Sequence, residues 1–264
     1  RDLHPMAHSF PTRRSSDLYR LGNSSYQYTT NQSAYVSLGC GTQTFSVYAV
    51  NDQATRDPSP ATQSITRSSN VSISITQPSG SSTYSSSTTA SVSGYISGAT
   101  SRTLRVNYGA ARSISSSFTE SVTLLEGQRN TVSISASSDC ASASRTLYIT
   151  HLANSGGLSD VAVNSSSITL TLWDYGQVDG DRIRIEFNGS VLANDLTLGG
   201  TDAKTVYNLR LGSGGNGLRI TALNTGSVGK NTAAISISNV VSGSDYQEYS
   251  AGLNENAAMV INLN

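Results

Sequence analysis

The sequence contains few of the residues on which catalytic and nucleic-acid-binding proteins depend. Its 264 residues include 3 histidines and 2 cysteines, and charged residues make up 13% with a net charge of zero. Sparse and balanced charge offers no basic surface for nucleic acid or for an anionic membrane. No apolar run reaches the roughly 18 residues of a membrane helix. We therefore expect no nucleic-acid partner and no membrane insertion of this segment.

Motifs for catalysis are missing as well. His4 and His8 lie near the N-terminus, and His151 ends an expected strand with no nucleophile elbow nearby. There is no HExxH motif, no phosphate-binding glycine loop before a helix, and no plausible long helix. We predict that the chain is not an enzyme and that His151 is solvated.

Serine, threonine, asparagine and glycine take the place of the missing residue types. Ser and Thr alternate with Val and Ile, which is typical of a sheet with one solvated face. Disordered segments lack this β-branched periodicity. The composition therefore favours a folded all-β protein.

One short phrase occurs three times at nearly equal spacing. The copies are Leu38-Gly-Cys-Gly41, Leu124-Leu-Glu-Gly127 and Leu211-Gly-Ser-Gly214. Their last glycines are 86 and 87 residues apart (127 − 41 and 214 − 127). After each copy comes an alternating apolar strand that ends at Ala49, Ala136 or Ala222. A repeat of this length, built of short strands, predicts tandem β-sandwich modules.

The first residues lack this pattern. Residues 8–18 resemble the conceptual translation of a common short-read sequencing adapter, so residues 1–18 are left out of the fold prediction. The modules are then expected at 19–67, 70–151 and 160–264. Gly41 follows position 18 by 23 residues (41 − 18), whereas Gly127 follows Asn70 by 57 (127 − 70). We therefore expect the first module to lack its opening strands and the chain to be a fragment.

The middle module carries the clearest motif. Its pattern V-x-I-x-x-P-x-x-G, then L-x-E-G-x-N-T-V-x-V-x-A-x-D, is matched at Ile75, Pro78, Gly80, Leu124, Glu126, Gly127, Asn130, Thr131, Val132, Ala136 and Asp139. Most of residues 70–150 thus resemble the bacterial immunoglobulin-like modules of secreted and surface proteins. The resemblance implies tandem immunoglobulin-like antiparallel β-sandwiches with an extracellular or cell-surface location. Such modules serve mainly as spacers or binding platforms.

The last module carries Trp173-Asp-Tyr-Gly-Gln-Val-Asp-Gly-Asp181 and, further on, Phe187-Asn-Gly189 and Gly214-Gly-Asn216. This WDxGxxDGD pattern looks like a module found at the ends of secreted bacterial proteins, which usually have proline where this chain has Lys230. The resemblance implies no catalytic activity.

The acidic loop of this pattern is a candidate metal site. Asp174, Asp179 and Asp181 lie within eight residues and repel one another unless they are solvated or bridged by a cation. Calcium, with a nearby amide such as Asn224 as a further ligand, is one interpretation. The other is a long polar hairpin loop in which Asp and Gly only shape turns.

Two other candidate sites rest on aromatic residues and on the cysteines. Trp173 is expected to face outward, where it is a candidate for stacking on a sugar ring, as are Tyr26 and Tyr28; the alternative is a structural role. Cys40 and Cys140 occur in different modules. They are either reduced, or Cys40 has lost its partner, or they form a disulfide across the junction of the two modules.

These observations favour a non-catalytic extracellular stalk or accessory region of a larger secreted or surface bacterial protein. The alternatives are a carbohydrate-binding accessory region of a polysaccharide hydrolase and an adhesin segment. The corresponding partners are a glycan or a cell-surface protein, and calcium is the candidate cofactor. The modules are expected to unfold nearly independently.

Overall fold

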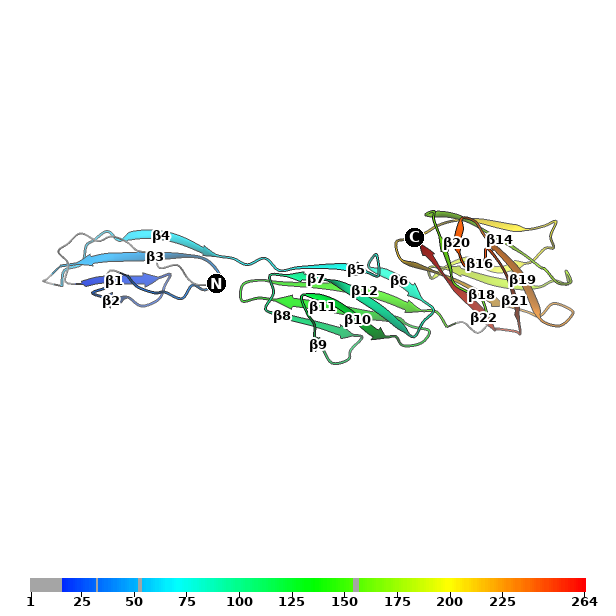
Figure 1. The fold of residues 1–264 in the computed structure, drawn as a ribbon, viewed down its shortest axis with the longest axis horizontal. Helices are drawn as coiled ribbons and strands as arrows, with labels where there is room; N and C mark the ends of the chain where they lie inside the picture. Colours follow the sequence, from blue (N-terminus) through cyan, green and yellow to red (C-terminus); the bar gives the residue numbers. More distant parts are fainter. Residues whose placement is uncertain (1–15, 32, 52–53, 154–156) are drawn as a thin grey trace. The chain divides into compact units, whose positions relative to one another are not determined.

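The computed structural model describes residues 16–31, 33–51, 54–153 and 157–264. Every regular element in these ranges is a β-strand, from β1 to β22 (Figure 1). The described residues form no helix that is long and apolar enough to cross a membrane. By its contacts the chain divides into two compact units, of which the first includes residues up to Val71 and the turns 98–100 and 137–142. The all-β prediction is confirmed.

The first module is a single four-stranded sheet in the order β2-β1-β3-β4. Its strands are β1 (Ser16–Leu21), β2 (Gln27–Thr29), β3 (Gly41–Val50) and β4 (Ala61–Arg67). A small core of Leu18, Tyr48 and Val50 lies on it, with Tyr26 packed against them. The described residues between 16 and 67 form no second sheet, and β4 is exposed along nearly its whole length.

The exclusion of residues 16–18 from the fold is wrong. Ser16, Asp17 and Leu18 begin β1 and pair with the last three residues of β3. Leu18 is only 7% exposed. Leu18 is apolar and completes the small core from β1, the strand next to β3. The polar residues before it, Ser16 and Asp17, did not indicate this burial. Residues 1–15, on which the rest of the prediction falls, lie outside the described residues.

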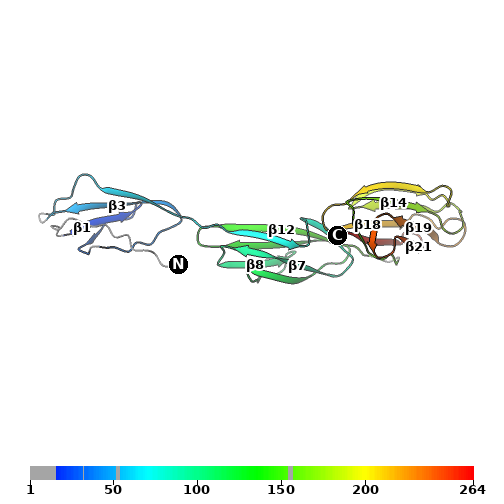
Figure 2. The same ribbon diagram turned by 45° about the horizontal axis from the view of Figure 1, so that its top comes forward.

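The second module is a two-sheet sandwich (Figure 2). One sheet has the order β10-β7-β5 and the other β6-β12-β11-β8-β9. The strands are β5 (Ser72–Gln77), β6 (Ser82–Ser85), β7 (Thr89–Ser97), β8 (Ser101–Val106), β9 (Arg112–Ser113), β10 (Ser117–Thr123), β11 (Arg129–Ser137) and β12 (Ser142–His151). The chain enters through β5 in one sheet and crosses to β6 in the other, where β6 pairs in parallel with β12. This is an immunoglobulin-like sandwich.

The third module is a larger sandwich of a six-stranded sheet, β16-β15-β18-β22-β13-β20, and a four-stranded sheet, β17-β14-β19-β21. The strands are β13 (Val161–Val163), β14 (Ser167–Trp173), β15 (Arg182–Phe187), β16 (Ser190–Thr197), β17 (Thr205–Arg210), β18 (Gly215–Ala222), β19 (Asn231–Ile237), β20 (Val240–Ser242), β21 (Tyr246–Ala251) and β22 (Asn256–Leu263). The alternating apolar residues of β14 and β15 point inward. Ile168, Leu170, Leu172, Ile183, Ile185 and Phe187 are all buried.

The threefold repeat marks the start of one central strand in each module. Gly41, Gly127 and Gly214 precede or open β3, β11 and β18, and all three have positive φ (87°, 63° and 85°). This backbone region is accessible to glycine at little cost and is strained for most other residues. The glycine therefore recurs because each strand begins with the same tight bend.

A side-chain amide closes the bend in every copy. Each amide oxygen accepts the backbone N–H of the residue after the repeat leucine. The pairs are Gly39 N to Gln43 Oε1 (3.2 Å), Leu125 N to Asn130 Oδ1 (2.7 Å) and Gly212 N to Asn216 Oδ1 (2.8 Å). Asn130 and Asn216 are buried, so the bend is held by hydrogen bonds that water cannot replace.

In the second and third modules another asparagine supports the first. Asn107 Nδ2 donates to Asn130 Oδ1 (3.0 Å), and Asn188 Nδ2 donates to Asn216 Oδ1 (2.9 Å). Asn107 and Asn188 each follow a strand, β8 or β15, and have φ values of 51° and 50°. The sequence analysis quoted Asn188 only as part of Phe187-Asn-Gly189 and assigned no role to Asn107. Two modules with little sequence in common thus share one asparagine pair, in which Asn130 or Asn216 is the buried member.

The second and third modules belong to one compact unit, which favours coupled unfolding of this pair over the predicted nearly independent unfolding. Tyr84 and Leu152 of the second module pack against Ala258 and Val260 of the third. A Cβ on Gly217 would lie 2.5 Å from Cδ1 of Tyr84, so glycine is needed where the ring lies on β18. The sequence analysis took Leu152 for part of a linker, but it is buried at this junction.

Tyr249 is fully buried in the core of the third module and provides a pH test of its packing. Burial raises its pKa to about 12, and its hydroxyl donates to the carbonyl of Glu255 (2.8 Å). Because the unfolded phenol ionises near pH 10, the stability that Tyr249 contributes is complete below about pH 10 and lost between about pH 10 and 12.

We expect Tyr249→Phe to cost about 1 kcal/mol of unfolding free energy at pH 8 and clearly less at pH 11.5. Denaturant unfolding at the two pH values measures the difference. The same cost at both values would show that the phenol titrates normally.

Candidate functional site

Three aspartates of the third module come together at one end of its sandwich. Asp174 directly follows β14, and Asp179 and Asp181 end the loop that leads to β15. One carboxylate oxygen of each lies within 4.8 Å of one from each of the other two. Asp174 is 2% exposed and Asp181 is 1% exposed. The structure thus brings together the three aspartates that the sequence analysis selected.

Thr232 at the start of β19 holds two of these carboxylates. Its hydroxyl donates to Asp174 Oδ1 (2.7 Å), and its backbone N–H donates to Asp181 Oδ2 (2.6 Å). Gly176 N also donates to Asp174 Oδ1 (2.9 Å), and Val228 N donates to Asp179 Oδ2 (2.6 Å). The second oxygens of the two buried carboxylates, Asp174 Oδ2 and Asp181 Oδ1, are buried and have no hydrogen-bond partner.

The surroundings of the cluster disfavour the charged form of Asp181. Burial raises the pKa of Asp181, and the charges of Asp179 and Asp174 raise it further, against the hydrogen bonds from Thr232. The adjacent Arg182 forms its ion pair with Asp195 instead. No ion pair among the described residues includes one of the three aspartates.

Asn224 has a different role from the expected metal ligand. Its Oδ1 accepts the backbone N–H of Arg182 (2.7 Å), and its Nδ2 donates to the carbonyl of Gly180 (2.8 Å). Its side chain therefore fixes the end of the acidic loop, and the expectation that it completes the ligand set is not supported.

Trp173 lies outside the core cluster that contains Leu170 and Leu172, as expected of an outward-facing residue, but its side chain is covered and only 8% exposed. Tyr246 lies beside it with ring centroids 5.8 Å apart, and Lys204 Nζ lies 4.1 Å from the centre of the indole. Tyr246 belongs to β21, and Lys204 lies in the segment before β17. The alternation within β14 gives no information about these distant residues. Trp173 thus offers no open ring face to a sugar.

Tyr26 and Tyr28 do not form a shared platform either. Tyr28 is 72% exposed, whereas Tyr26 packs edge-on against Tyr48 and lies beneath the guanidinium of Arg20. The hydroxyl of Tyr26 donates to that of Tyr48 (3.2 Å). Tyr26 is therefore part of the small core of the first module.

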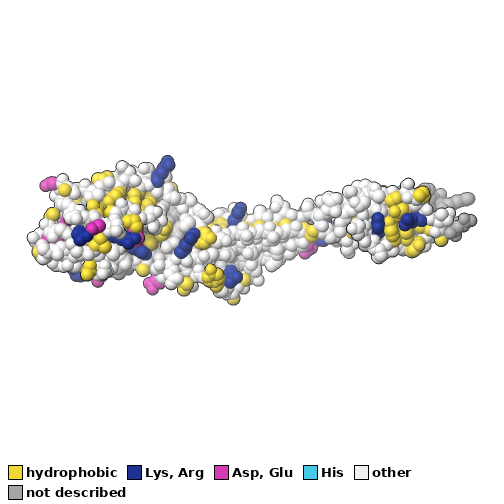
Figure 3. Space-filling model, turned by 180° about the vertical axis from the view of Figure 1, so that it is seen from behind, with side chains coloured by type: hydrophobic (Ala, Val, Ile, Leu, Met, Phe, Trp, Pro, Cys, Tyr) yellow, Lys and Arg dark blue, Asp and Glu magenta, His cyan; other side chains and the backbone are white. Residues whose placement is uncertain are grey.

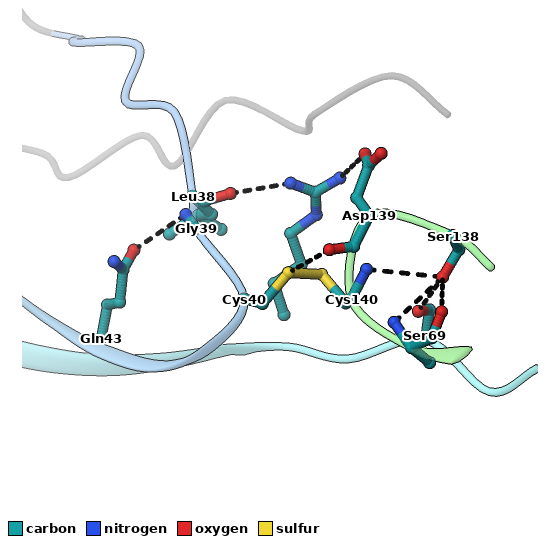
Figure 4. Close-up of a disulfide and its surroundings, with 10 residues drawn as sticks. Leu38, Gly39, Cys40, Gln43, Ser69, Ser138, Asp139 and Cys140 are labelled. Atoms are coloured by element: carbon teal, nitrogen blue, oxygen red, sulfur yellow. Dashed lines mark hydrogen bonds and ion pairs between the residues drawn. A yellow bond between two sulfur atoms is a disulfide. The ribbon is translucent and has the colours of Figure 1, made fainter. Parts of the chain in front are cut away.

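Cys40 and Cys140 form a disulfide with a Cα separation of 5.2 Å (Figure 4). Cys140 lies in the turn between β11 and β12, which belongs to the first unit by its contacts. Arg67 reinforces the connection by donating to the carbonyl of Leu38 (2.9 Å) and to Asp139 Oδ2 (2.8 Å). Cys40 is exposed and Cys140 is half-buried, so the bond is accessible to a reductant.

His151 is buried rather than solvated, contrary to the sequence-based expectation. Its Nδ1 accepts the backbone N–H of Gly127 (3.0 Å), the repeat glycine of the second module. His151 is the last residue of β12, and this contact gives it a structural role.

Comparison with known proteins adds little to this picture. No family model matches the sequence, and no curated protein matches it. Among solved structures, a chimeric titin Z1Z2-Z1Z2 tandem is 10% identical and covers 73% of this chain and 100% of its own, with a TM-score of 0.25. The BSP domain of a biofilm-associated protein is 14% identical over 84% of this chain and 42% of its own, with a TM-score of 0.27.

A third similar structure is the Bacteroides ovatus mixed-linkage glucan utilization locus protein SGBP-B in complex with a heptasaccharide. It is 9% identical and covers 79% of this chain and 91% of its own, with a TM-score of 0.17. Scores this low carry no argument about function, so the assignment of the fold rests on the sheets themselves.

Proposed function

We propose that this chain is a non-catalytic spacer or accessory region of a larger secreted or cell-surface protein. The observation that carries the proposal is the packed junction between the second and third modules. A spacer must limit the rotation of successive modules relative to one another. This requires contacts between the modules in addition to the chain that connects them.

The junction contains buried polar contacts as well as the apolar cluster around Tyr84. Thr83 is 5% exposed, and its hydroxyl accepts the backbone N–H of Gly215 (2.7 Å). A second and exposed polar contact joins the modules, in which Ser86 Oγ donates to Asp160 Oδ2 (2.5 Å), while Asp160 Oδ1 accepts the backbone N–H of Val260 within the third module (2.8 Å). Buried hydrogen bonds are costly to break and depend on direction, so they favour one orientation of the two modules.

Two further observations support an extracellular spacer. Disulfides form and persist mainly in oxidising compartments, and the chain contains one. The face in Figure 3 consists mostly of uncharged polar side chains and backbone, with few charged groups. Such a surface agrees with a region that separates functional domains. The glycan-binding alternative loses its main candidate with the burial of Trp173, and the adhesin alternative stays a hypothesis.

Thr83→Val tests the junction, because valine keeps the shape and removes the hydroxyl. In the unmutated protein we expect the second and third modules to unfold in one cooperative transition. The variant is expected to lose about 1–2 kcal/mol of coupling, so that the transition broadens or splits in scanning calorimetry. Thr123→Val, at an exposed position of the same module, is the matched control and should change little.

Two results would contradict the proposal. Separate transitions in the unmutated protein would show that the junction does not couple the modules. Specific and saturable binding to a glycan array would favour the glycan-binding alternative instead.

A further inference from the structure

The acidic cluster of the third module has a property that its structural role does not explain. Buried carboxylates are normally paired with a cation or fully hydrogen-bonded, because desolvation of an unpaired charge is costly. Asp174 and Asp181 are at least 98% buried, and each has one oxygen without a hydrogen-bond partner. Asp179 brings a third carboxylate within 4.8 Å of them.

A hairpin loop does not need this arrangement. The turn is already held by Asn224 and by the backbone hydrogen bonds from Asp174 N to Gly199 O (2.7 Å) and from Leu198 N to Asp181 O (2.8 Å). The side chains of the three aspartates are therefore not required to close the loop. The hydrogen bonds from Gly176, Val228 and Thr232 reach one oxygen of each carboxylate, and they leave the burial of Asp174 Oδ2 and Asp181 Oδ1 unexplained.

We propose that Asp174, Asp179 and Asp181 bind one Ca²⁺ ion. The donors are all oxygen atoms, which a hard cation prefers, and water completes the six to eight positions of the coordination sphere. The oxygens lie within 4.8 Å of one another, close enough to share one ion. Ca²⁺ accepts irregular sets of carboxylate oxygens, whereas Mg²⁺ demands near-ideal octahedral geometry and dehydrates reluctantly, so Ca²⁺ is the ion assigned.

Thr232 and Val228 provide the support that such a site needs. Their donors hold one oxygen of each carboxylate, which orients the other oxygen of Asp174 and of Asp181 and lowers the entropy cost of binding. Ca²⁺ would thereby connect the loop after β14 with the start of β19 and with the segment around Val228. With three carboxylates in all, the dissociation constant is expected to be about 10⁻⁴ M, which suits extracellular calcium.

The experiment uses the full chain after treatment with a chelator. Addition of 5 mM Ca²⁺ is expected to raise the melting temperature of the transition that contains the third module by roughly 5 °C. The emission of Trp173, the single tryptophan, should change over the same concentration range, because it directly precedes Asp174. Mg²⁺ at the same concentration should have a much smaller effect.

Asp179→Asn is the test variant, because Asp179 is less buried than its two neighbours. In chelator the variant should melt at or above the temperature of the unmutated protein, since it removes one repelling charge. In Ca²⁺ it should lose the rise in melting temperature and the change in emission. Asp202→Asn, an exposed aspartate of the same module, is the matched control and should keep both responses.

Terbium provides a measurement that does not depend on any variant. Tb³⁺ bound at the cluster should be sensitised by Trp173, and Ca²⁺ should displace it. Melting and emission that are independent of Ca²⁺ in the unmutated protein, or terbium luminescence that Ca²⁺ does not reduce, would overturn the proposal. An Asp179→Asn variant that responds like the unmutated protein would overturn it as well.

Discussion

Asn130→Ala is expected to destabilise the second module by about 3 kcal/mol, although the residue lies far from any candidate ligand site. Asn130 is fully buried and donates to the carbonyls of Leu125 (3.1 Å) and Gln128 (3.0 Å). It also accepts from Leu125 N and from Asn107 Nδ2. Alanine would remove the partner of Leu125 N, Leu125 O and Asn107 Nδ2, each at about 1 kcal/mol, whereas the carbonyl of Gln128 keeps the N–H of His151.

Denaturant unfolding of the full chain measures this cost. Gln128→Ala, which removes an exposed amide two residues away, is the matched control and should cost less than about 0.5 kcal/mol. Asn130→Asp keeps the acceptors but loses both donors and buries a charge, so it should be at least as damaging as alanine. A small effect of both Asn130 variants would mean that water replaces the amide and that the repeat has another cause.

Reduction of the Cys40–Cys140 disulfide is expected to cost the first unit about 3.5 kcal/mol. If the second module stays folded, the loop that the disulfide closes runs from Cys40 to the start of β5, which is 32 residues (72 − 40). The chain entropy of a loop of that length gives this value. The first module is sensitive to the loss because its core is small.

Thermal unfolding with and without a reductant tests the effect, and the double variant Cys40→Ser, Cys140→Ser should match the reduced protein. The double variant itself should not respond to the reductant. Mass analysis of the unreduced chain should show no free thiol, and two free thiols would contradict the disulfide. A reductant that leaves every transition unchanged would show that the bond does not stabilise the fold.

Alternation along the chain was enough to predict the long strands. β7, β10, β11, β14 and β15 bury every second residue, and burial of one sheet face requires that period. The short strands β6 and β9 have four and two residues, too few to show a period, so alternation does not predict them. These two strands form because neighbouring strands provide the partners for their backbone hydrogen bonds.

The candidate site shows the same division between local and distant information. The acidic loop was visible in the sequence because its three aspartates lie within eight residues. Thr232, which holds two of them, comes from β19 more than fifty residues later, so no local pattern indicated it. The covering of Trp173 was not foreseen for the same reason, since Tyr246 and Lys204 come from distant segments.

The sequence by itself determined the all-β class, the spacing of the modules and the start of their central strands. These features follow from periodicity and from glycines whose backbone conformation few other residues adopt. Only the tertiary structure decided which side chains are buried at the junction, which asparagines pair, and that Asp174 and Asp181 each retain an unpartnered oxygen. The physical reason is that burial and hydrogen-bond satisfaction depend on groups brought together from distant strands, and no local pattern records those partners.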